Sequence, residues 1–222
     1  MTNIAPRVIY EEMPYHSQFA SPELVGPIVF GEMQAKDDPR WSESGASTPE
    51  EYARWAWNLC GMVCLKSVLE YTDKPGKEQT LMALARTCID EGGYVVGEDE
   101  IKGLYYGPFV KFAEKEFGLE GRVASPLSIA DIVQEINDGN FVIASVHPTI
   151  RDFSPPPRQG GHLVLLTGYD IADENGPKLY YHDPAGLYEK SQAFASAPVS
   201  TFEKYFAGRG VVLTRPPEAA EV

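Results

Sequence analysis

The sequence predicts an α+β fold in which helices dominate the first part of the chain and strands the second. Between residues 48 and 138, apolar residues recur at helical spacing in several segments. From residue 140 onward, short runs rich in β-branched and aromatic residues are bounded by Gly and Pro, as in strands joined by loops. The 222 residues suffice for one domain with a substantial core. We expect residues 1–216 to form this domain and residues 217–222 to be a disordered tail.

The first 47 residues are expected to be extended and loop segments. The stretch "RVIYEEMPYHSQ" opens with strand-like residues at Arg7. "AKDDPRWSESGAS" is polar and rich in turn residues, which predicts a surface loop. We interpret residues 19–47 as an insertion or loop region.

A helix start signal follows in "STPEEYARWAWNL". Thr48 is the predicted N-cap, Pro49 the first helical residue, and two glutamates occupy the first turn. Helical spacing resumes in "GMVCLKSVLEY". Because Gly costs about 1 kcal/mol inside a helix, Gly61 predicts a boundary, with one helix ending near Leu59 and the next beginning near Cys60.

Three more helices and four strands complete the prediction. The helices lie in "TLMALARTCIDEGG", "GPFVKFAEKEFGL" and "SIADIVQEINDGN", the last with Ser128 as its cap and Gly139 at its end. The strands lie in "NFVIASVHP", "GHLVLLTGYD", "KLYYHDP" and "GRGVVLTRP". We expect the first three strands to be neighbours in a largely antiparallel sheet. The long, Pro-rich loop "RDFSPPPRQGG" leads directly into His162.

The charge balance excludes some partners. Lys and Arg number 19 against 32 Asp and Glu, for a net charge of −13. Such a surface repels phosphate backbones and anionic lipid, so we expect neither nucleic-acid nor membrane-surface binding. The charge mainly indicates solubility, or else a preference for a cationic or neutral partner. No stretch approaches the roughly 20 apolar residues that span a bilayer.

Cysteine usage and the first residues indicate a cytoplasmic protein. The odd count of three cysteines excludes a complete disulfide framework. The first residues have no continuous apolar core, so we expect no secretion signal. Thiols kept reduced are typical of the cytoplasm.

Cys60 is the candidate nucleophile. At a helix N-terminus, unpaired N–H groups and the positive end of the dipole favour the thiolate, which is the reactive form. Cys64, one turn further on among apolar residues, and Cys88 are expected to be core residues. Core filling is also the alternative for Cys60, because free cysteine is among the most buried residue types.

His162 and Asp183 are the candidate partners of this thiol. If their two strands form a hairpin, the start of the first lies near the end of the second, which places His162 beside Asp183. A carboxylate next to an imidazole fixes its tautomer and stabilises its protonated form. The alternative for "YYHDPAG" is an ordinary turn. His182 points to the opposite face of the strand and is the weaker candidate, and His147 is expected to be structural.

Zinc binding is a rival use of the same residues. Cys60, Cys64, His162 and Asp183 are candidate ligands, but two cysteines four apart on a helix match the usual zinc spacings poorly. The aromatic residues Trp55, Trp57, Tyr105 and Tyr106 are expected to lie in the core, with lining of a cleft as the alternative.

The ordered set "MPYHSQ", "NLCGMVCLKSVL", "GGHLVLLTGYD" and "YYHDPAG" resembles the papain-like cysteine peptidases. It is most similar to the bacteriocin-processing type, which removes double-glycine leader peptides. The resemblance implies a single papain-like domain, in which a helix carrying the cysteine packs against an antiparallel sheet carrying the histidine and the aspartate. It also implies that Gln18 supplies an oxyanion donor, with Gln34 as a weaker alternative.

Two departures from the family pattern limit what the resemblance implies. A long insertion separates Gln18 from Cys60. Met62-Val63-Cys64 stands where the family often has a proline and small residues, so substrate specificity is not carried over.

Together these residues predict a cysteine hydrolase or peptidase that forms an acyl-enzyme on a peptide, or on another amide or thioester substrate. This chemistry needs no cofactor. The first alternative is an amide-forming acyltransferase in a biosynthetic pathway that uses the same triad. The second is a catalytically silent peptide-binding module. The sequence does not indicate an oligomeric state.

Overall fold

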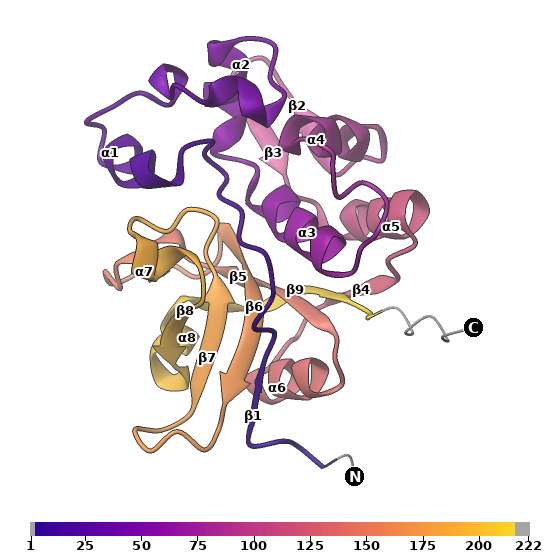
Figure 1. Ribbon diagram of the computed structural model, residues 1–222, viewed down its shortest axis with the longest axis vertical. Coiled ribbons are helices and arrows are strands. Elements are labelled where there is room, and N and C mark those ends of the chain that lie inside the picture. Colours follow the sequence, from indigo (N-terminus) through magenta and orange to yellow (C-terminus); the bar gives the residue numbers. More distant parts are fainter. Residues whose placement is uncertain (1–2, 216–222) are drawn as a thin grey trace.

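The computed structural model describes residues 3–215, so the expected tail at 217–222 lies outside the described residues. A helical part that contains α2–α5 lies above a sheet built mainly from the second half of the chain (Figure 1). The helices and short 3-10 segments are η1 (Pro22–Leu24), α1 (Val25–Val29), η2 (Ala35–Asp37), η3 (Trp41–Ser44), α2 (Pro49–Ala56), α3 (Cys60–Tyr71), α4 (Leu81–Asp90), α5 (Tyr106–Phe117), α6 (Ile129–Asn137), η4 (Pro148–Arg151), α7 (Glu189–Gln192) and α8 (Val199–Tyr205). The strands are β1 (Arg7–Ile9), β2 (Tyr94–Val96), β3 (Ile101–Gly103), β4 (Gly121–Ala124), β5 (Phe141–Val146), β6 (His162–Asp170), β7 (Lys178–His182), β8 (Ala195–Pro198) and β9 (Phe206–Leu213).

The sheet is antiparallel throughout, in the order β4-β9-β5-β6-β7-β8. Strand β1 pairs with the C-terminal end of β6. All six residues of β5 and eight of the nine in β6 are buried, because helices cover the centre of the sheet. Both α3 and α6 contact β5 and β6. The predicted α+β class and the adjacency of the three central strands are therefore confirmed.

The predicted helix starts are confirmed by their caps. The Thr48 hydroxyl accepts a hydrogen bond from the Glu51 N–H, and Pro49 is the first residue of α2. Ser128 and Asp131 form a reciprocal capping box at the start of α6. Helix α3 begins at Cys60 as predicted, but α2 ends at Ala56, earlier than the predicted end near Leu59.

Gly61 is explained by close packing and not by the helix boundary that the sequence suggested. It lies inside the first turn of α3, after the break between the helices. A Cβ atom at this position would lie 2.4 Å from Leu104 Cδ2 and 3.2 Å from Leu163 Cδ1. The segment after β3 and the start of β6 pack directly against the helix that carries Cys60, so a larger residue at position 61 would force Leu104 to move.

Residues 19–47 differ from the expectation of loops. They contain α1 and three 3-10 segments, whose apolar residues form a second, smaller core with Tyr52 of α2. Asp38 is completely buried and accepts hydrogen bonds from the N–H and hydroxyl of Ser21 (3.0 and 2.6 Å), the Arg40 N–H (2.9 Å) and the Tyr52 hydroxyl (2.7 Å). The expectation of a surface loop is thus wrong at Asp38, because hydrogen bonds from distant residues compensate the burial of its charge.

Five further elements carry too little periodicity to be predicted. They are the β2–β3 hairpin, β4, β8 and α8, and each is short. Within residues 3–215, no helix has the length and apolar character needed to cross a bilayer.

Candidate active site

Cys60 is the first residue of α3, and no side chain caps this helix. The first intrahelical hydrogen bond is donated by the Val63 N–H to the Leu59 carbonyl. The N–H groups before Val63 therefore have no acceptor within the helix, which leaves the positive end of the helix dipole at the sulfur. Cys60 is partly exposed, whereas Cys64 and Cys88 are buried.

The β6–β7 hairpin brings His162 and Asp183 together. The register pairs Leu165 with His182, so the first residue of β6 lies beside the residue that follows β7. His162 Nε2 lies 2.7 Å from Asp183 Oδ1, and the Ala185 N–H donates to the same oxygen at 2.9 Å. Asp183 is completely buried, and its Oδ2 has no hydrogen-bond partner within the described chain.

The hydrogen bond with Asp183 leaves Nδ1 of His162 as the nitrogen available to the Cys60 thiol. Burial of the imidazole opposes its charge, but the Asp183 carboxylate and hydrogen bonds with Asp183 and Cys60 outweigh burial and raise the pKa of His162 to about 10. The imidazole therefore holds its proton at neutral pH. This is the arrangement that a thiolate–imidazolium pair requires.

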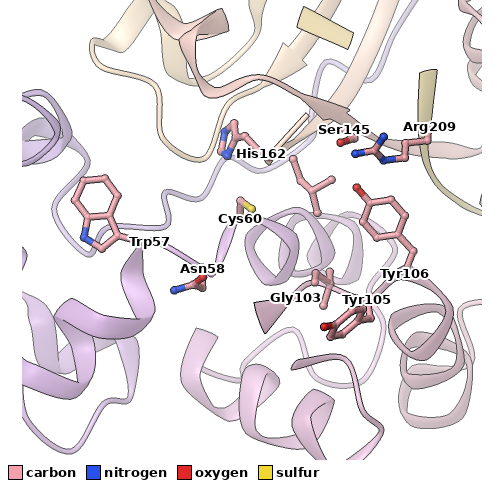
Figure 2. Close-up of a pocket in the computed structure, with 12 residues that line it drawn as sticks. Trp57, Asn58, Cys60, Gly103, Tyr105, Tyr106, Ser145, His162 and Arg209 are labelled. Carbon is pink, nitrogen blue, oxygen red and sulfur yellow. The ribbon is translucent and has the colours of Figure 1, made fainter. Parts of the chain in front are cut away.

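Cys60 and His162 face a cleft of about 410 Å³ between the helical part and the sheet. Figure 2 shows the sulfur and the imidazole near the middle of the cleft, with Trp57 and Asn58 to one side and Tyr106 and Arg209 to the other. The lining residues are Trp57, Asn58, Cys60, Gly103, Leu104, Tyr105, Tyr106, Ser145, Gly161, His162, Leu163 and Arg209. Trp57, Tyr105 and Tyr106 thus line the cleft and are not core residues, whereas Trp55 is buried against Tyr94.

Two other histidines have structural contacts. His182 Nε2 donates to the Met13 carbonyl at 3.0 Å and Nδ1 accepts from the Phe194 N–H at 3.0 Å. Burial lowers the pKa of His182 to about 4, so this imidazole is neutral. His147 Nδ1 accepts a hydrogen bond from the Thr149 N–H at the start of η4. Neither imidazole lines the cleft.

The second thiol of α3 is sealed in the core. Burial raises the pKa of Cys64 well above its ordinary value, and its sulfur lies 4.0 Å from the Leu163 carbonyl. Within residues 3–215, no three His, Cys, Asp or Glu side chains are grouped so that they could hold a metal ion. The four candidate zinc ligands are thus not assembled into a metal site.

Gln18 lies beside the aspartate but not in the cleft lining. Its N–H donates to the Pro184 carbonyl at 2.9 Å, its side chain is buried, and its Oε1 has no partner within the described chain. It lines a neighbouring hollow. Its role as an oxyanion donor stays a prediction. Gln34 is exposed at the start of η2 and lines neither the cleft nor this hollow.

Sequence analysis missed Ser145 and Arg209. Both lie on strands of the sheet, β5 and β9, and reach the cleft only through strand pairing. The available signal was a serine within the apolar run "FVIASV", where a polar side chain is unusual unless it has a partner or faces a cavity.

Comparisons with known proteins agree with this architecture. The family model described as "Peptidase_C39 like family" matches residues 44–212. A crystal structure described as a C39-like peptidase from Bacillus anthracis superposes with a TM-score of 0.55 at 18% sequence identity. The match covers 96% of this chain and 99% of that one, and at this identity it shows the fold alone. No curated protein matches the sequence. Because the family model covers most of the chain, this protein belongs to the peptidase C39-like family.

Proposed function

We propose that the protein is a cysteine peptidase in which Cys60 is the nucleophile, His162 the general base and acid, and Asp183 the residue that orients the imidazole. The observation that carries the proposal is the 2.7 Å contact between His162 Nε2 and Asp183 Oδ1 behind a partly exposed thiol at a helix N-terminus. Membership of the family supports a peptide as substrate.

In the proposed resting enzyme His162 already holds the Cys60 proton, which gives a thiolate–imidazolium pair. The thiolate attacks the carbonyl carbon of the scissile amide, and the negative charge that develops on the carbonyl oxygen is stabilised by the Cys60 N–H and the predicted donor Gln18. Each such donor typically contributes roughly 3 kcal/mol. The C–N bond then breaks as His162 protonates the leaving amine, which leaves a thioester on Cys60. His162 next accepts a proton from water, whose oxygen displaces the sulfur and releases a carboxylic acid.

Asp183 acts through His162 in this scheme. Its carboxylate holds Nε2, so that Nδ1 stays directed at the thiol and the imidazolium is stabilised at each step. The Ala185 N–H bond to the same oxygen holds the carboxylate in place.

The experiment is a comparison of two thiols on one helix. Wild type, Cys60→Ala and Cys64→Ala are treated with iodoacetamide at neutral pH, and the labelled peptide is identified by mass spectrometry. Cys60→Ala is expected to abolish both the fast labelling and peptide hydrolysis, while Cys64→Ala keeps both. Fast labelling at Cys64, or a Cys60 inert to alkylation, would refute the assignment.

The same acyl-enzyme also supports the acyltransferase alternative. A wild-type reaction with a peptide or thioester substrate is run with and without an added primary amine. Hydrolysis that is unaffected by the amine supports a peptidase, whereas amide product above the hydrolysis background would reassign the reaction to acyl transfer.

A further inference from the structure

The cleft has a polar end that the proposed mechanism does not use. It is formed by the Arg209 guanidinium, the Ser145 hydroxyl and the Tyr106 hydroxyl, here called the Arg209 end. Figure 2 shows the Tyr106 hydroxyl and the Arg209 guanidinium pointing toward one another, on the side of Cys60 away from Trp57. The three side chains come from β9, β5 and α5, so they meet only in the folded protein.

A break in strand register places Arg209 there. Ala144 of β5 pairs with Gly210 of β9, but Val146 pairs with Phe206, so two steps along β5 correspond to four along β9. The extra residues form a bulge in which Gly208 adopts a φ of +63°. Bulges next to active sites commonly re-aim a side chain, and here the bulge carries Arg209 to the cleft beside Ser145.

Gly160 lies against two polar groups of the Arg209 end. A Cβ atom on Gly160 would lie 2.9 Å from Arg209 Nη2 and 3.3 Å from Ser145 Oγ. The guanidinium and the hydroxyl thus lie against the same glycine, two residues before His162. A side chain at this position would displace the Arg209 guanidinium, so the first glycine of "GGH" leaves room for the guanidinium beside Ser145.

The polar groups at this end have no partners within residues 3–215. No ion pair engages the Arg209 guanidinium, and no hydrogen bond engages the Ser145 or Tyr106 hydroxyl. Although Ser145 as a whole is only 1% exposed, it lines the cleft, where its hydroxyl is available to a ligand.

The electrostatics favour an anion at this end. None of the described residues that line the cleft is Asp or Glu, although the chain carries a net charge of −13. A second arginine, Arg158, has its Nη2 3.7 Å from the Cβ position of Gly161. The positive field of Arg158 and Arg151 also adds to burial in lowering the pKa of the nearby His147.

We infer that Arg209 is a specificity-determining residue that binds a carboxylate of the peptide substrate, with the Ser145 and Tyr106 hydroxyls as further donors. The planar guanidinium matches a carboxylate with two parallel hydrogen bonds, which a lysine or a neutral side chain does not. The carboxylate comes either from an acidic side chain near the scissile bond or from the C-terminus of a short peptide. This inference rests on the proposed peptidase function for its setting in the reaction.

The test uses fluorescence-quenched peptides in matched pairs. One series exchanges Glu for Gln at each of three positions on either side of the cleaved bond, and a second compares free with amidated C-termini. Wild type is expected to prefer one carboxylate by about 10- to 100-fold in kcat/KM, the usual range for a hydrogen-bonded charge. The series that shows the preference identifies the source of the carboxylate.

Three variants test whether Arg209 causes the preference for a carboxylate. Arg209→Gln is expected to lose this preference, so that the carboxylate and neutral members of a pair are cleaved with equal kcat/KM. Arg209→Lys retains part of it, and Arg122→Gln, which removes an exposed arginine outside the cleft, retains all of it. The preference also falls as salt is raised, because exposed charges are screened. Loss of preference in Arg122→Gln, or its retention in Arg209→Gln, would overturn the inference.

A binding measurement separates this inference from the proposed function. Fluorescently labelled members of the same pairs are titrated into Cys60→Ala, with and without Arg209→Gln. If wild type hydrolyses nothing but Cys60→Ala binds the carboxylate member more tightly through Arg209, the peptidase proposal fails and the anion site stands. If wild type hydrolyses the peptides and no carboxylate position matters, the peptidase proposal stands and the anion site is refuted.

Discussion

Replacement of Asp183 by Asn tests the candidate triad with almost no change of shape. Asp183 Oδ1 accepts from His162 Nε2 at 2.7 Å and from the Ala185 N–H at 2.9 Å, and an amide oxygen accepts the same two bonds. The change removes the negative charge that favours the imidazolium. It also turns Oδ2, which is buried without a partner, into an amide NH₂ group with no acceptor.

The size of the effect follows from the hydrogen bond that loses its charge. Hydrogen bonds to charged groups contribute about 1.5–3 kcal/mol, and one pKa unit corresponds to about 1.4 kcal/mol. The pKa of His162, which is raised to about 10 in the wild type, is therefore expected to fall by roughly one to two units. Because that pKa still lies above neutral, slower alkylation of Cys60 is expected mainly in alkaline solution, where the variant loses its imidazolium at a lower pH than the wild type.

The assay is an NMR titration of the His162 ring in protein labelled at histidine, supported by alkylation rates. With four histidines in the chain, the resonances can be assigned by substitution. The matched control is Asp173→Asn, which loses an ion pair with Lys178 in the loop between β6 and β7, outside the cleft. An unchanged His162 titration in Asp183→Asn would show that the carboxylate does not hold the imidazolium, and the triad would be wrong.

The raised pKa of His162 also defines how the free energy of unfolding depends on pH. Because the folded-state pKa of His162 is raised, its contribution to the free energy of unfolding is complete below the unfolded value near 6.5 and disappears as the pH rises toward 10. The destabilisation of Asp183→Asn is therefore largest at about pH 6 and shrinks in alkaline solution.

The remaining predictions concern packing and buried polar groups. Gly61→Ala is expected to lower the free energy of unfolding, measured in urea, by about 1–3 kcal/mol, because its Cβ overlaps Leu104. Gly107→Ala, with nothing within 4 Å of its Cβ, should instead be neutral or stabilising. Equal losses in the two variants would refute the packing argument. Because the pKa of His182 is lowered to about 4, the free energy of unfolding should fall by about 3 kcal/mol between pH 6.5 and 4. The fall should be smaller in His182→Asn, whose side chain does not titrate. Identical pH profiles of the two proteins would contradict the neutral imidazole. Asp38→Ala is expected to make the 19–47 segment sensitive to limited proteolysis while Cys60 alkylation persists, because the buried hydrogen bonds of Asp38 hold that segment; unchanged proteolysis would show that these bonds are dispensable.

Most of the helices and central strands could be predicted because they depend on local sequence patterns. The Thr48 cap and the Ser128 capping box mark helix starts, and the apolar runs of β5 and β6 mark the centre of the sheet. The juxtaposition of His162 and Asp183 followed from one assumption, a hairpin between two adjacent strands, and the structure contains that hairpin. The short elements β2, β3, β4 and β8 were missed because three or four residues are too few to show a period.

What the sequence by itself determined is the class of the fold, the helix start at Cys60 and the order of the residues proposed as a triad. These depend on capping, periodicity and a neighbouring strand pair, which act over a few residues or across one hairpin. The tertiary structure decided which thiol reaches solvent, why residue 61 is glycine, and that Asp38 is buried. It also assembled the Arg209 end from three separate elements. Such features depend on contacts between residues distant in the sequence, and local physical preferences carry no information about which distant groups will meet.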